Sequence, residues 1–216
     1  MIRVSQDVKC RSLGHNYEGQ EMEITGRLDQ YRVSVPLLGQ YQLDNTAAVI
    51  AALEVLQEKG YQISREHILT GLAKVDFPGR MNIISRHPLI LADGGHNPGA
   101  AHKLKESLLE YFHPEKAILV IGISSDKDIP GIIDELSPVF NTVFATRANS
   151  QRSAKPEIIA AEFGKHGLQA ATFSSVAGAL NEAKSVAGEN DLICVTGSLY
   201  VVGEALEYIN SYSGNH

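Results

Sequence analysis

Hydrophobic and polar residues alternate along the first part of the chain, as far as Pro36. A period of two is typical of strands that bury one face and expose the other. The segment Glu21-Met22-Glu23-Ile24 alternates strictly. We therefore expect half-buried strands here, with the alternation continued at four further positions: Leu28, Tyr31, Val33 and Val35.

The pattern becomes helical at Asp44. Apolar residues cover a wide face as far as Lys59, and Gly60 supplies a C-terminal stop. A second short helix is expected after Ser64, whose side chain can cap it, and its inward face should be formed by Ile68, Leu69 and Leu72. A short sheet with two helices is marginally stable alone. We therefore hypothesise that this segment is the end of a larger domain.

After Phe77-Pro78-Gly79-Arg80, which we interpret as a linker, the pattern becomes a repetition of strand, loop and helix. The run Ile118-Leu119-Val120-Ile121 is apolar throughout, which fits a strand buried on both faces of a mainly parallel sheet. Alternating strands and helices predict a doubly wound α/β domain of about 135 residues. The expected strands are Met81–Ser85, Leu89–Ala92, Ala117–Ile121, Thr142–Ala145, Gln169–Phe173 and Leu192–Val195, and helices should start near Pro98, Asp128, Lys155, Ser175 and Leu199.

The composition is that of a globular protein. Of the 216 residues, 44% are hydrophobic and 20% charged, which excludes a disordered or collagenous chain. The formal charge of −6 argues against a broad nucleic-acid footprint, and no apolar run is long enough for a membrane helix. The opening residues lack the apolar core of a signal peptide, and Cys10 and Cys194 have no metal-ligand spacing. We expect a cytoplasmic protein.

Candidate chemistry lies in the loops that follow the strands, because ligands of open α/β sheets bind beyond the carboxyl ends of the strands. The first such loop, Asp93-Gly94-Gly95-His96-Asn97, leads into a helix whose N–H groups favour phosphate or carboxylate. Asp93 could accept hydrogen bonds from ribose hydroxyls, and His96 could contact a phosphate. A tight turn, in which both side chains merely bond the backbone, explains the same residues equally well.

The later loops leave similar alternatives open. Lys127, between two acidic residues, could fix a carboxylate or be a solvated surface lysine. Arg147 and Arg152 could bind anions or be solvated. Ser198 stands where a helix N-cap belongs, and capping alone could explain it. The sequence contains no G-x-x-x-x-G-K-S/T loop, no G-x-G-x-x-G fingerprint and no H-E-x-x-H motif.

Five motifs in order make the chain recognisable over residues 36 to about 205. It resembles the folylpolyglutamate synthase / dihydrofolate synthase family of the Mur ligase superfamily. The resemblance implies an ATP-dependent amide ligase, in which a carboxylate is phosphorylated to an acyl phosphate and the amine of glutamate displaces the phosphate. The motifs are Pro36–Ala48, which contains Gln-x-x-Asn, then Phe77-Pro78-Gly79-Arg80, Asp93-Gly94-Gly95-His96-Asn97-Pro98, Asp126-Lys127-Asp128 and Gly197-Ser198-Leu199-Tyr200.

The resemblance also implies roles for single residues. Asn45 would hydrogen-bond adenine and Asp93 would bind the ribose. Arg80 would reach the ATP phosphates, and His96 would lie near the phosphates and the reacting groups, as the expected catalytic residue. Such groups suit phosphoryl and acyl transfer, where catalysis is mostly positioning and electrostatics. The positions that hold the incoming glutamate in related ligases are matched by Lys127 and Ser198.

The implied organisation has three parts. Residues 1–77 would be the C-terminal remnant of a central ATP-binding domain, residues 78–80 an interdomain linker, and residues 81–216 a Mur ligase C-terminal, Rossmann-like domain with a mostly parallel sheet flanked by helices. The family's phosphate-binding loop and magnesium ligands belong to its N-terminal region, and nothing in this sequence matches them. We therefore expect no metal ligands in this chain and no ligase activity from it alone.

The implied partners are ATP, Mg²⁺, L-glutamate and a folate or related pterin, in a monomer without nucleic acid or membrane. Two positions depart from the family pattern: Tyr41 replaces a usual His and Gly95 a usual Ala. A peptidoglycan Mur ligase is the alternative within the superfamily, although Gln42 before Asn45 and the Asp-Gly-Gly-His-Asn-Pro string favour the folate branch. A nucleotide- or anion-binding module without catalysis is the alternative outside it.

Overall fold

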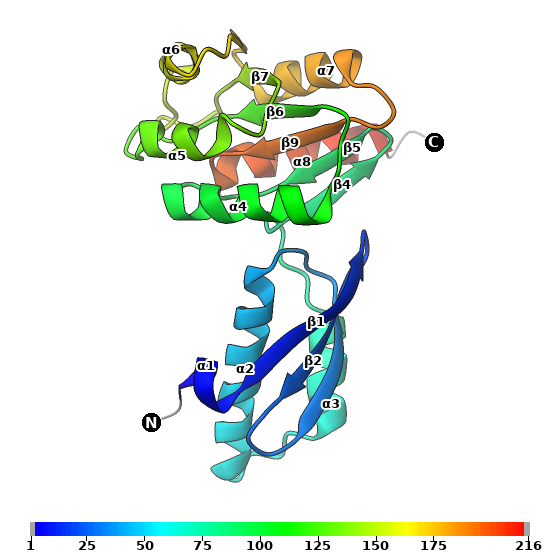
Figure 1. Cartoon of the computed structure of the whole chain (residues 1–216). Coiled ribbons are helices and arrows are strands. Elements are labelled where there is room, and N and C mark those ends of the chain that lie inside the picture. The colour runs from blue at the N-terminus through cyan, green and yellow to red at the C-terminus, as the bar shows by residue number, and fades with distance from the viewer. Residues whose placement is uncertain (1–2, 214–216) are drawn as a thin grey trace. The chain divides into compact units, whose positions relative to one another are not determined.

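The structure is a computed structural model that describes residues 3–213, and it divides into two compact units. The first unit is Met1–Pro78 and the second unit is Gly79–His216 (Figure 1). No helix among the described residues is both long and apolar enough to cross a membrane.

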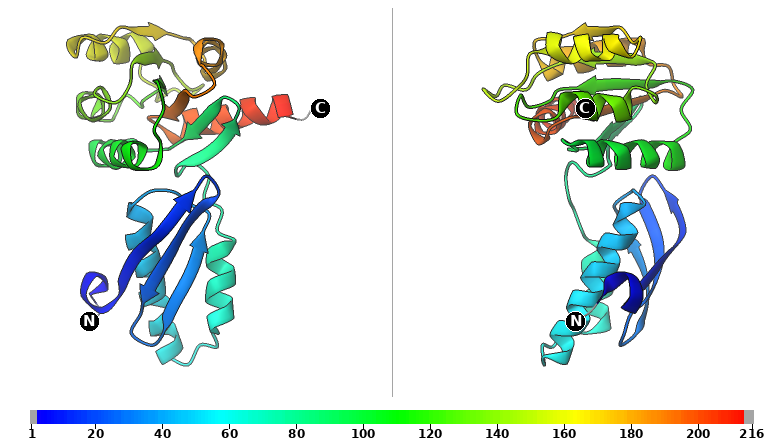
Figure 2. Two further views of the ribbon diagram at one scale, coloured as in Figure 1. Left: turned by 45° about the vertical axis from the view of Figure 1, so that its right-hand side comes forward. Right: turned by 60° about the vertical axis from the view of Figure 1, so that its left-hand side comes forward.

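The first unit is an antiparallel three-stranded sheet, in the order β1-β2-β3, whose inner face packs on two helices (Figure 2). Its alternating positions are buried as predicted, since Met22 and Ile24 of one strand and Tyr31, Val33 and Val35 of the next all lie in the core. The elements are α1 (Val4–Asp7), β1 (Lys9–Asn16), β2 (Gly19–Thr25), β3 (Gln30–Val35), α2 (Tyr41–Glu58) and α3 (Arg65–Ala73).

The prediction for Leu28 was wrong. The residue is 52% exposed, because it lies in the turn between β2 and β3 rather than in a strand. The turn is closed by the Gly26 N–H, which donates to the Asp29 carbonyl at 2.9 Å. The predicted cap of α3 is confirmed: Ser64 Oγ accepts the N–H of His67 at 3.1 Å.

The second unit is a six-stranded sheet flanked by helices, which confirms the predicted α/β class with a mostly parallel sheet. The strand order is β4-β5-β9-β6-β7-β8, and within this described sheet only the pair β4–β5 is antiparallel. The elements are β4 (Asn82–Arg86), β5 (Leu89–Ala92), α4 (Pro98–Tyr111), β6 (Ala117–Ile121), α5 (Ile129–Leu136), β7 (Thr142–Ala145), α6 (Pro156–Lys165), β8 (Ala170–Thr172), α7 (Val176–Val186), β9 (Leu192–Thr196) and α8 (Leu199–Ser213).

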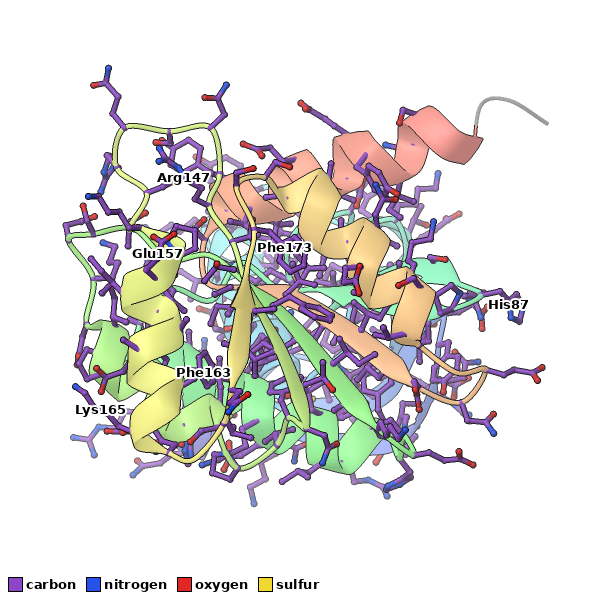
Figure 3. The ribbon with its side chains drawn as sticks, turned by 90° about the horizontal axis from the view of Figure 1, so that it is seen from above. His87, Arg147, Glu157, Phe163, Lys165 and Phe173 are labelled. Carbon is purple, nitrogen blue, oxygen red and sulfur yellow. The ribbon has the colours of Figure 1, made fainter. Side chains whose placement is uncertain are left out.

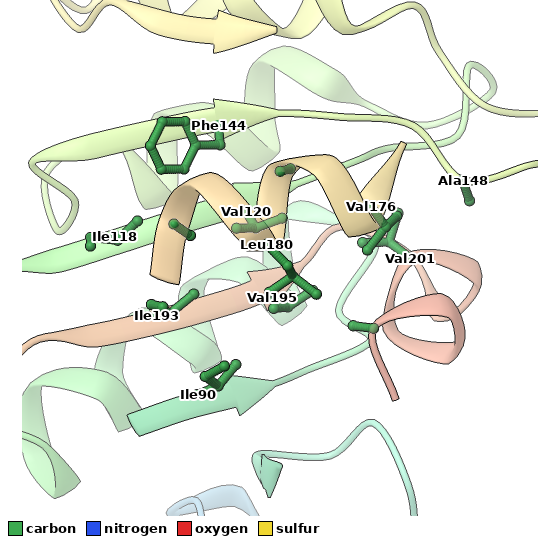
Figure 4. Packing of buried hydrophobic residues seen from close by; sticks show 13 residues of the cluster. Ile90, Ile118, Val120, Phe144, Ala148, Val176, Leu180, Ile193, Val195 and Val201 are labelled. Atoms are coloured by element: carbon green, nitrogen blue, oxygen red, sulfur yellow. The ribbon is translucent and has the colours of Figure 1, made fainter. Parts of the chain in front are cut away.

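Helices cover both faces of this sheet. On one face, α7 and α8 pack over alternate residues of the strands, such as Ile118, Val120 and Val195 (Figure 4). The helices α4 and α5 pack on each other over the opposite face (Figure 1). Every residue of β6 is buried, as its continuous apolar run predicts.

The helices of the second unit begin where the sequence indicates. The side chains of Asn97, Asp128 and Ser175 each accept a hydrogen bond from the backbone N–H three residues later, which fixes the first turns of α4, α5 and α7. The strand β4 starts at Asn82 instead of Met81, because Met81 has a φ of 51°, outside the range of a strand.

Candidate functional site

The second unit has a topological switch point at the carboxyl ends of three neighbouring strands. The central strand β9 pairs in parallel with β5 on one side and β6 on the other, with Val195 opposite both Ala92 and Val120. The chain leaves β5 and β6 for α4 and α5 on one face of the sheet, but it leaves β9 for α8 on the other face. Diverging connections of this kind open a crevice in which α/β proteins bind ligands.

Asp93, directly after β5, is buried with 6% of its surface exposed. One carboxylate oxygen accepts the N–H of Gly95 at 2.8 Å and the other accepts the N–H of Met81 at 3.1 Å. Burial raises the pKa of the Asp93 carboxyl, and the N–H groups of Gly95 and Met81 and the charge of Arg80 oppose that rise. Each oxygen of a carboxylate can accept a second hydrogen bond.

Gly94 allows the Arg80 side chain to lie across this loop. A Cβ at Gly94 would collide with the side chain of Leu199 and would lie 3.3 Å from Arg80 Nη1. The Gly94 N–H donates to the Gly79 carbonyl at 2.8 Å, and Arg80 Nη1 donates to the same carbonyl at 3.1 Å. The absence of a side chain at Gly94 therefore brings the guanidinium next to the loop that holds Asp93.

His96 is half-buried and its ring nitrogen Nδ1 lies 3.1 Å from the Gly94 carbonyl oxygen. Because a carbonyl only accepts, this geometry places a proton on Nδ1, and a neutral ring then keeps an acceptor lone pair on Nε2. Within residues 3–213, Nε2 has no hydrogen-bond partner. The orientation of the ring thus leaves one nitrogen available to a ligand.

Lys127 is in an ion pair. Its Nζ lies 3.2 Å from Asp126 Oδ2, and Arg152 Nη2 lies 3.0 Å from the same oxygen. The hydrogen bonds from Lys127 and Arg152 hold the pKa of Asp126 below its ordinary value. Arg147 is exposed in the loop that follows β7 (Figure 3). An anion that uses Lys127 would therefore share or replace the Asp126 contact.

Ser198 caps α8, since its Oγ accepts the N–H of Val201 at 3.2 Å. The preceding residue, Gly197, has a φ of 99°, and a Cβ there would lie 2.7 Å from the Gly122 carbonyl oxygen. The backbones of the loops after β9 and β6 therefore touch at this point. Capping accounts for the serine in this structure, and its hydroxyl stays at the edge of the sheet where β5, β9 and β6 end.

The N-termini of α4 and α5 also meet at this edge. A Cβ on Gly131 of α5 would lie 2.7 Å from Cγ of Pro98, the first residue of α4. The first turns of both helices are therefore in contact. The N–H groups of these turns and the positive ends of the two helix dipoles favour an anion there. No group of three or more His, Cys, Asp or Glu side chains within the described part of the chain could hold a metal ion.

The second unit thus brings together most of the residues singled out in the sequence. Arg80, Asp93 and His96 lie around Gly94, and Lys127 and Ser198 are on the two neighbouring loops. Asn45 is on α2 of the first unit, where its Nδ2 donates to Gln42 Oε1 at 2.9 Å.

Asn82 holds the backbone beside the site, which the sequence pattern did not indicate. Its side-chain oxygen accepts the N–H groups of both Gly79 and Arg80, the latter at 3.1 Å. Asparagine is common wherever a chain turns, so the residue type alone does not indicate this role. The sequence offered one signal for it, the position directly after Arg80-Met81.

Comparisons with known proteins agree with this architecture. Residues 79–199 match the family described as Mur ligase, glutamate ligase domain. The "Probable bifunctional folylpolyglutamate synthase/dihydropteroate synthase" of Haloferax volcanii is 32% identical over 197 residues, which are 90% of this chain and 23% of that protein. The folylpolyglutamate synthase of Lacticaseibacillus casei is 31% identical over 186 residues, which are 86% of this chain and 41% of that protein.

Solved structures give the same result. The Mycobacterium tuberculosis folylpolyglutamate synthase complexed with ADP matches with a TM-score of 0.84 and 28% identity over 94% of this chain and 48% of that one. Escherichia coli FolC in complex with DHPP and ADP matches with a TM-score of 0.81 and 26% identity over 96% of this chain and 47% of that one. The chain spans less than half the length of these relatives. It belongs to the Mur ligase glutamate ligase family, and its relatives are folylpolyglutamate and dihydrofolate synthases.

Proposed function

We propose that this chain is part of an ATP-dependent amide ligase that adds glutamate to a folate or a related pterin. The observation that carries the proposal is the loop Asp93–Asn97 at the switch point, with Arg80 lying against it and one nitrogen of His96 available. The relatives support the reaction class, because they are folylpolyglutamate and dihydrofolate synthases.

The residues of the second unit suit a nucleotide. Gly94 has no side chain, which lets Arg80 and Leu199 pack against this loop, and the buried Asp93 carboxylate keeps acceptor capacity for hydroxyl groups. In the proposal Asp93 holds the ribose, Arg80 neutralises phosphate charge and His96 lies near the reacting groups. ATP, when bound, supplies the phosphoryl group that activates the acceptor carboxylate.

The glutamate would be held by the neighbouring loops. Lys127 would exchange its contact with Asp126 for a carboxylate of the amino acid, and the Ser198 hydroxyl would donate a hydrogen bond while still capping α8. Water exclusion at this edge would favour attack by the amine over hydrolysis of the activated carboxylate.

The first unit is proposed as the end of a central ATP-binding domain, joined through residues 78–80 to the glutamate ligase domain. In that role Asn45 holds adenine, and its amide, now bonded to Gln42, can serve as both donor and acceptor for the base. Magnesium is expected with the nucleotide, although the described residues contain no cluster of three or more side chains that could hold it.

Binding experiments on the 216-residue chain test the nucleotide and amino-acid sites. Titration with ATP, followed by amide NMR, should shift the signals of Asp93–Asn97, and titration with L-glutamate should shift those around Lys127 and Ser198. The affinity should be weak, because few groups contact the phosphates. Shifts confined to other parts of the chain would contradict the assignment.

The ligase activity can be tested in a chimera that joins this chain to the N-terminal part of the L. casei enzyme, in place of the 41% of that protein that it matches. ATP- and glutamate-dependent turnover is expected with a folate substrate and not with a muramyl substrate. A folded chimera that turns over only the muramyl substrate would favour the peptidoglycan branch instead.

A further inference from the structure

The segment Gly79-Arg80-Met81 has an unusual backbone conformation. Gly79 has a φ of 80° and Met81 a φ of 51°, and Met81 is the one residue other than glycine with a positive φ in the described part of the chain. A left-handed conformation is costly for a side chain as long as methionine, and it persists only where the surroundings impose it. Two observations identify what imposes it here.

First, Met81 is almost completely buried, which restricts its side chain. Second, the N–H groups of all three residues are bound by two side chains. Asn82 Oδ1 accepts those of Gly79 and Arg80, and Asp93 Oδ2 accepts that of Met81 at 3.1 Å. Asn82 and Asp93 are brought close because Asn82 pairs with Ala92 at the start of the β4–β5 hairpin.

The loop conformation contributes to the position of the Arg80 guanidinium. The Gly79 carbonyl accepts from both Arg80 Nη1 and the Gly94 N–H, so it joins the arginine side chain to the Asp93–Asn97 loop. If the Gly79 N–H loses its acceptor, the peptide can rotate and the position of this carbonyl is no longer fixed. The arginine side chain would then lose the acceptor that joins it to the Asp93–Asn97 loop, and restoring this position on binding would cost entropy.

We infer that Asn82 is a positioning residue, which holds the Gly79–Met81 loop so that Arg80 is directed to the phosphates of a nucleotide. This inference rests on the proposed function, since Arg80 is the group assumed to touch the phosphates. Asn82 itself contacts no ligand in this scheme, and its effect passes entirely through Arg80.

The first test measures the loop alone. In Asn82→Ala, hydrogen exchange of the Gly79 and Arg80 amides should become much faster, while the Met81 amide, bound to Asp93, stays protected. Asn82→Asp keeps an acceptor oxygen in the same place and should restore the protection. Unchanged exchange of the Gly79 and Arg80 amides in Asn82→Ala would overturn the inference, whatever the chain binds.

The second test measures binding of ATP and of adenosine. Hydrogen bonds to charged groups contribute enough for Arg80→Ala to weaken ATP binding about tenfold, and loss of positioning in Asn82→Ala should weaken it about threefold. Adding Asn82→Ala to Arg80→Ala should cause no further loss, because the two act as one unit. Adenosine, which has no phosphates, should bind all variants equally well.

Asn141→Ala is the matched control. Asn141 Oδ1 accepts the N–H of Ala117 at 3.3 Å, where β6 and β7 begin. The variant therefore removes a similar side-chain hydrogen bond at the other end of the strands from the loop. It should leave ATP affinity unchanged. The positioning role would be overturned if Asn82→Ala lowered the affinities for ATP and adenosine equally. It would also be overturned if the double variant bound ATP threefold more weakly than Arg80→Ala.

The outcomes separate the inference from the proposed function. If Arg80→Ala leaves ATP affinity unchanged, or if ATP shifts no signal of Asp93–Asn97, the proposed function fails and the positioning role falls with it. If Arg80→Ala weakens ATP binding but Asn82→Ala does not, the function stands and only the role of Asn82 is wrong.

Discussion

Each unit contains a buried carboxylate that binds the backbone of a turn, and the two differ in how many donors they meet. In the first unit, Glu54 of α2 is completely buried and meets four donors: the N–H groups of Arg27, Leu28 and Asp29, at 2.8, 3.1 and 3.3 Å, and the Tyr31 hydroxyl at 3.2 Å. In the second unit, Asp93 accepts from two backbone N–H groups.

The surroundings of the two carboxylates differ as well. Glu54 fills the turn so closely that a Cβ on Gly26 would collide with it, and it has no room for a ligand. Asp93 lies at the carboxyl edge of a parallel sheet, beside Arg80 and two glycines. The comparison shows that burial of a charge and bonds to backbone amides do not by themselves indicate a binding site. Unused acceptor capacity at the carboxyl ends of parallel strands distinguishes the second carboxylate.

The largest effect on stability is expected for Glu54→Gln. The amide nitrogen of glutamine would face backbone donors, and a buried charge-assisted network would be lost, so the free energy of unfolding should fall by about 3 kcal/mol. Urea unfolding of the chain measures this. Glu58→Gln is the control, because Glu58 pairs with Arg27 at 2.7 Å on the surface, where ion pairs contribute little to stability. If both variants lowered the free energy of unfolding by similar amounts, the buried network would contribute no more than a surface ion pair.

Asp93→Asn should destabilise the second unit less, by about 1–2 kcal/mol, because one oxygen remains to accept an N–H. It should also weaken the ATP-dependent NMR shifts of Asp93–Asn97. Loss of stability with undiminished shifts would indicate that the carboxylate only stabilises the turn, which is the alternative left open by the sequence.

The environment of Tyr31 predicts that the stability of the first unit depends on pH. Burial, followed by the charge of Glu54 and the hydrogen bond to it, raises the pKa of Tyr31 to about 12. The folded state therefore keeps this proton when the unfolded chain loses it, so stability should fall as pH rises from about 10 to about 12. Tyr31→Phe should flatten this slope, measured by urea unfolding at several alkaline pH values. If Tyr31→Phe left the pH dependence of stability unchanged, other titrating groups would be responsible for it.

The smallest effect on stability is expected for His96→Ala. The ring makes one bond, to the Gly94 carbonyl, and it is half-buried, so the free energy of unfolding should change by less than about 0.5 kcal/mol. In the chimera described above the same change should reduce turnover strongly. Equal losses of stability and turnover would support a purely structural role.

Local patterns predicted the second unit well. The bounds of β5, β6 and β7 agree with the sequence, because continuous apolar runs between polar loops leave little choice of where a strand begins and ends. The helices α4 and α5 also begin near the predicted residues, because Asn97 and Asp128 cap them and capping depends on residues only three positions apart.

Other features depended on contacts between distant segments. Leu28 continues an alternating pattern, yet it is exposed because the Glu54 carboxylate binds the turn in which it lies, 26 residues away in the chain. Asn82 gave no distinctive signal, because its role depends on the β4–β5 pairing and on the positive φ of Met81. These features involve partners that no local window contains.

The sequence by itself determined the elements of the second unit and the family to which it belongs, because helix caps, apolar runs and ordered motifs are local. The tertiary structure alone decided that β9 inserts between β5 and β6, so that the loops carrying Asp93, Lys127 and Ser198 end at one edge. The physical reason is that strand order is set by which faces and edges pack most favourably across the whole sheet, and segments far apart in the chain share in that choice.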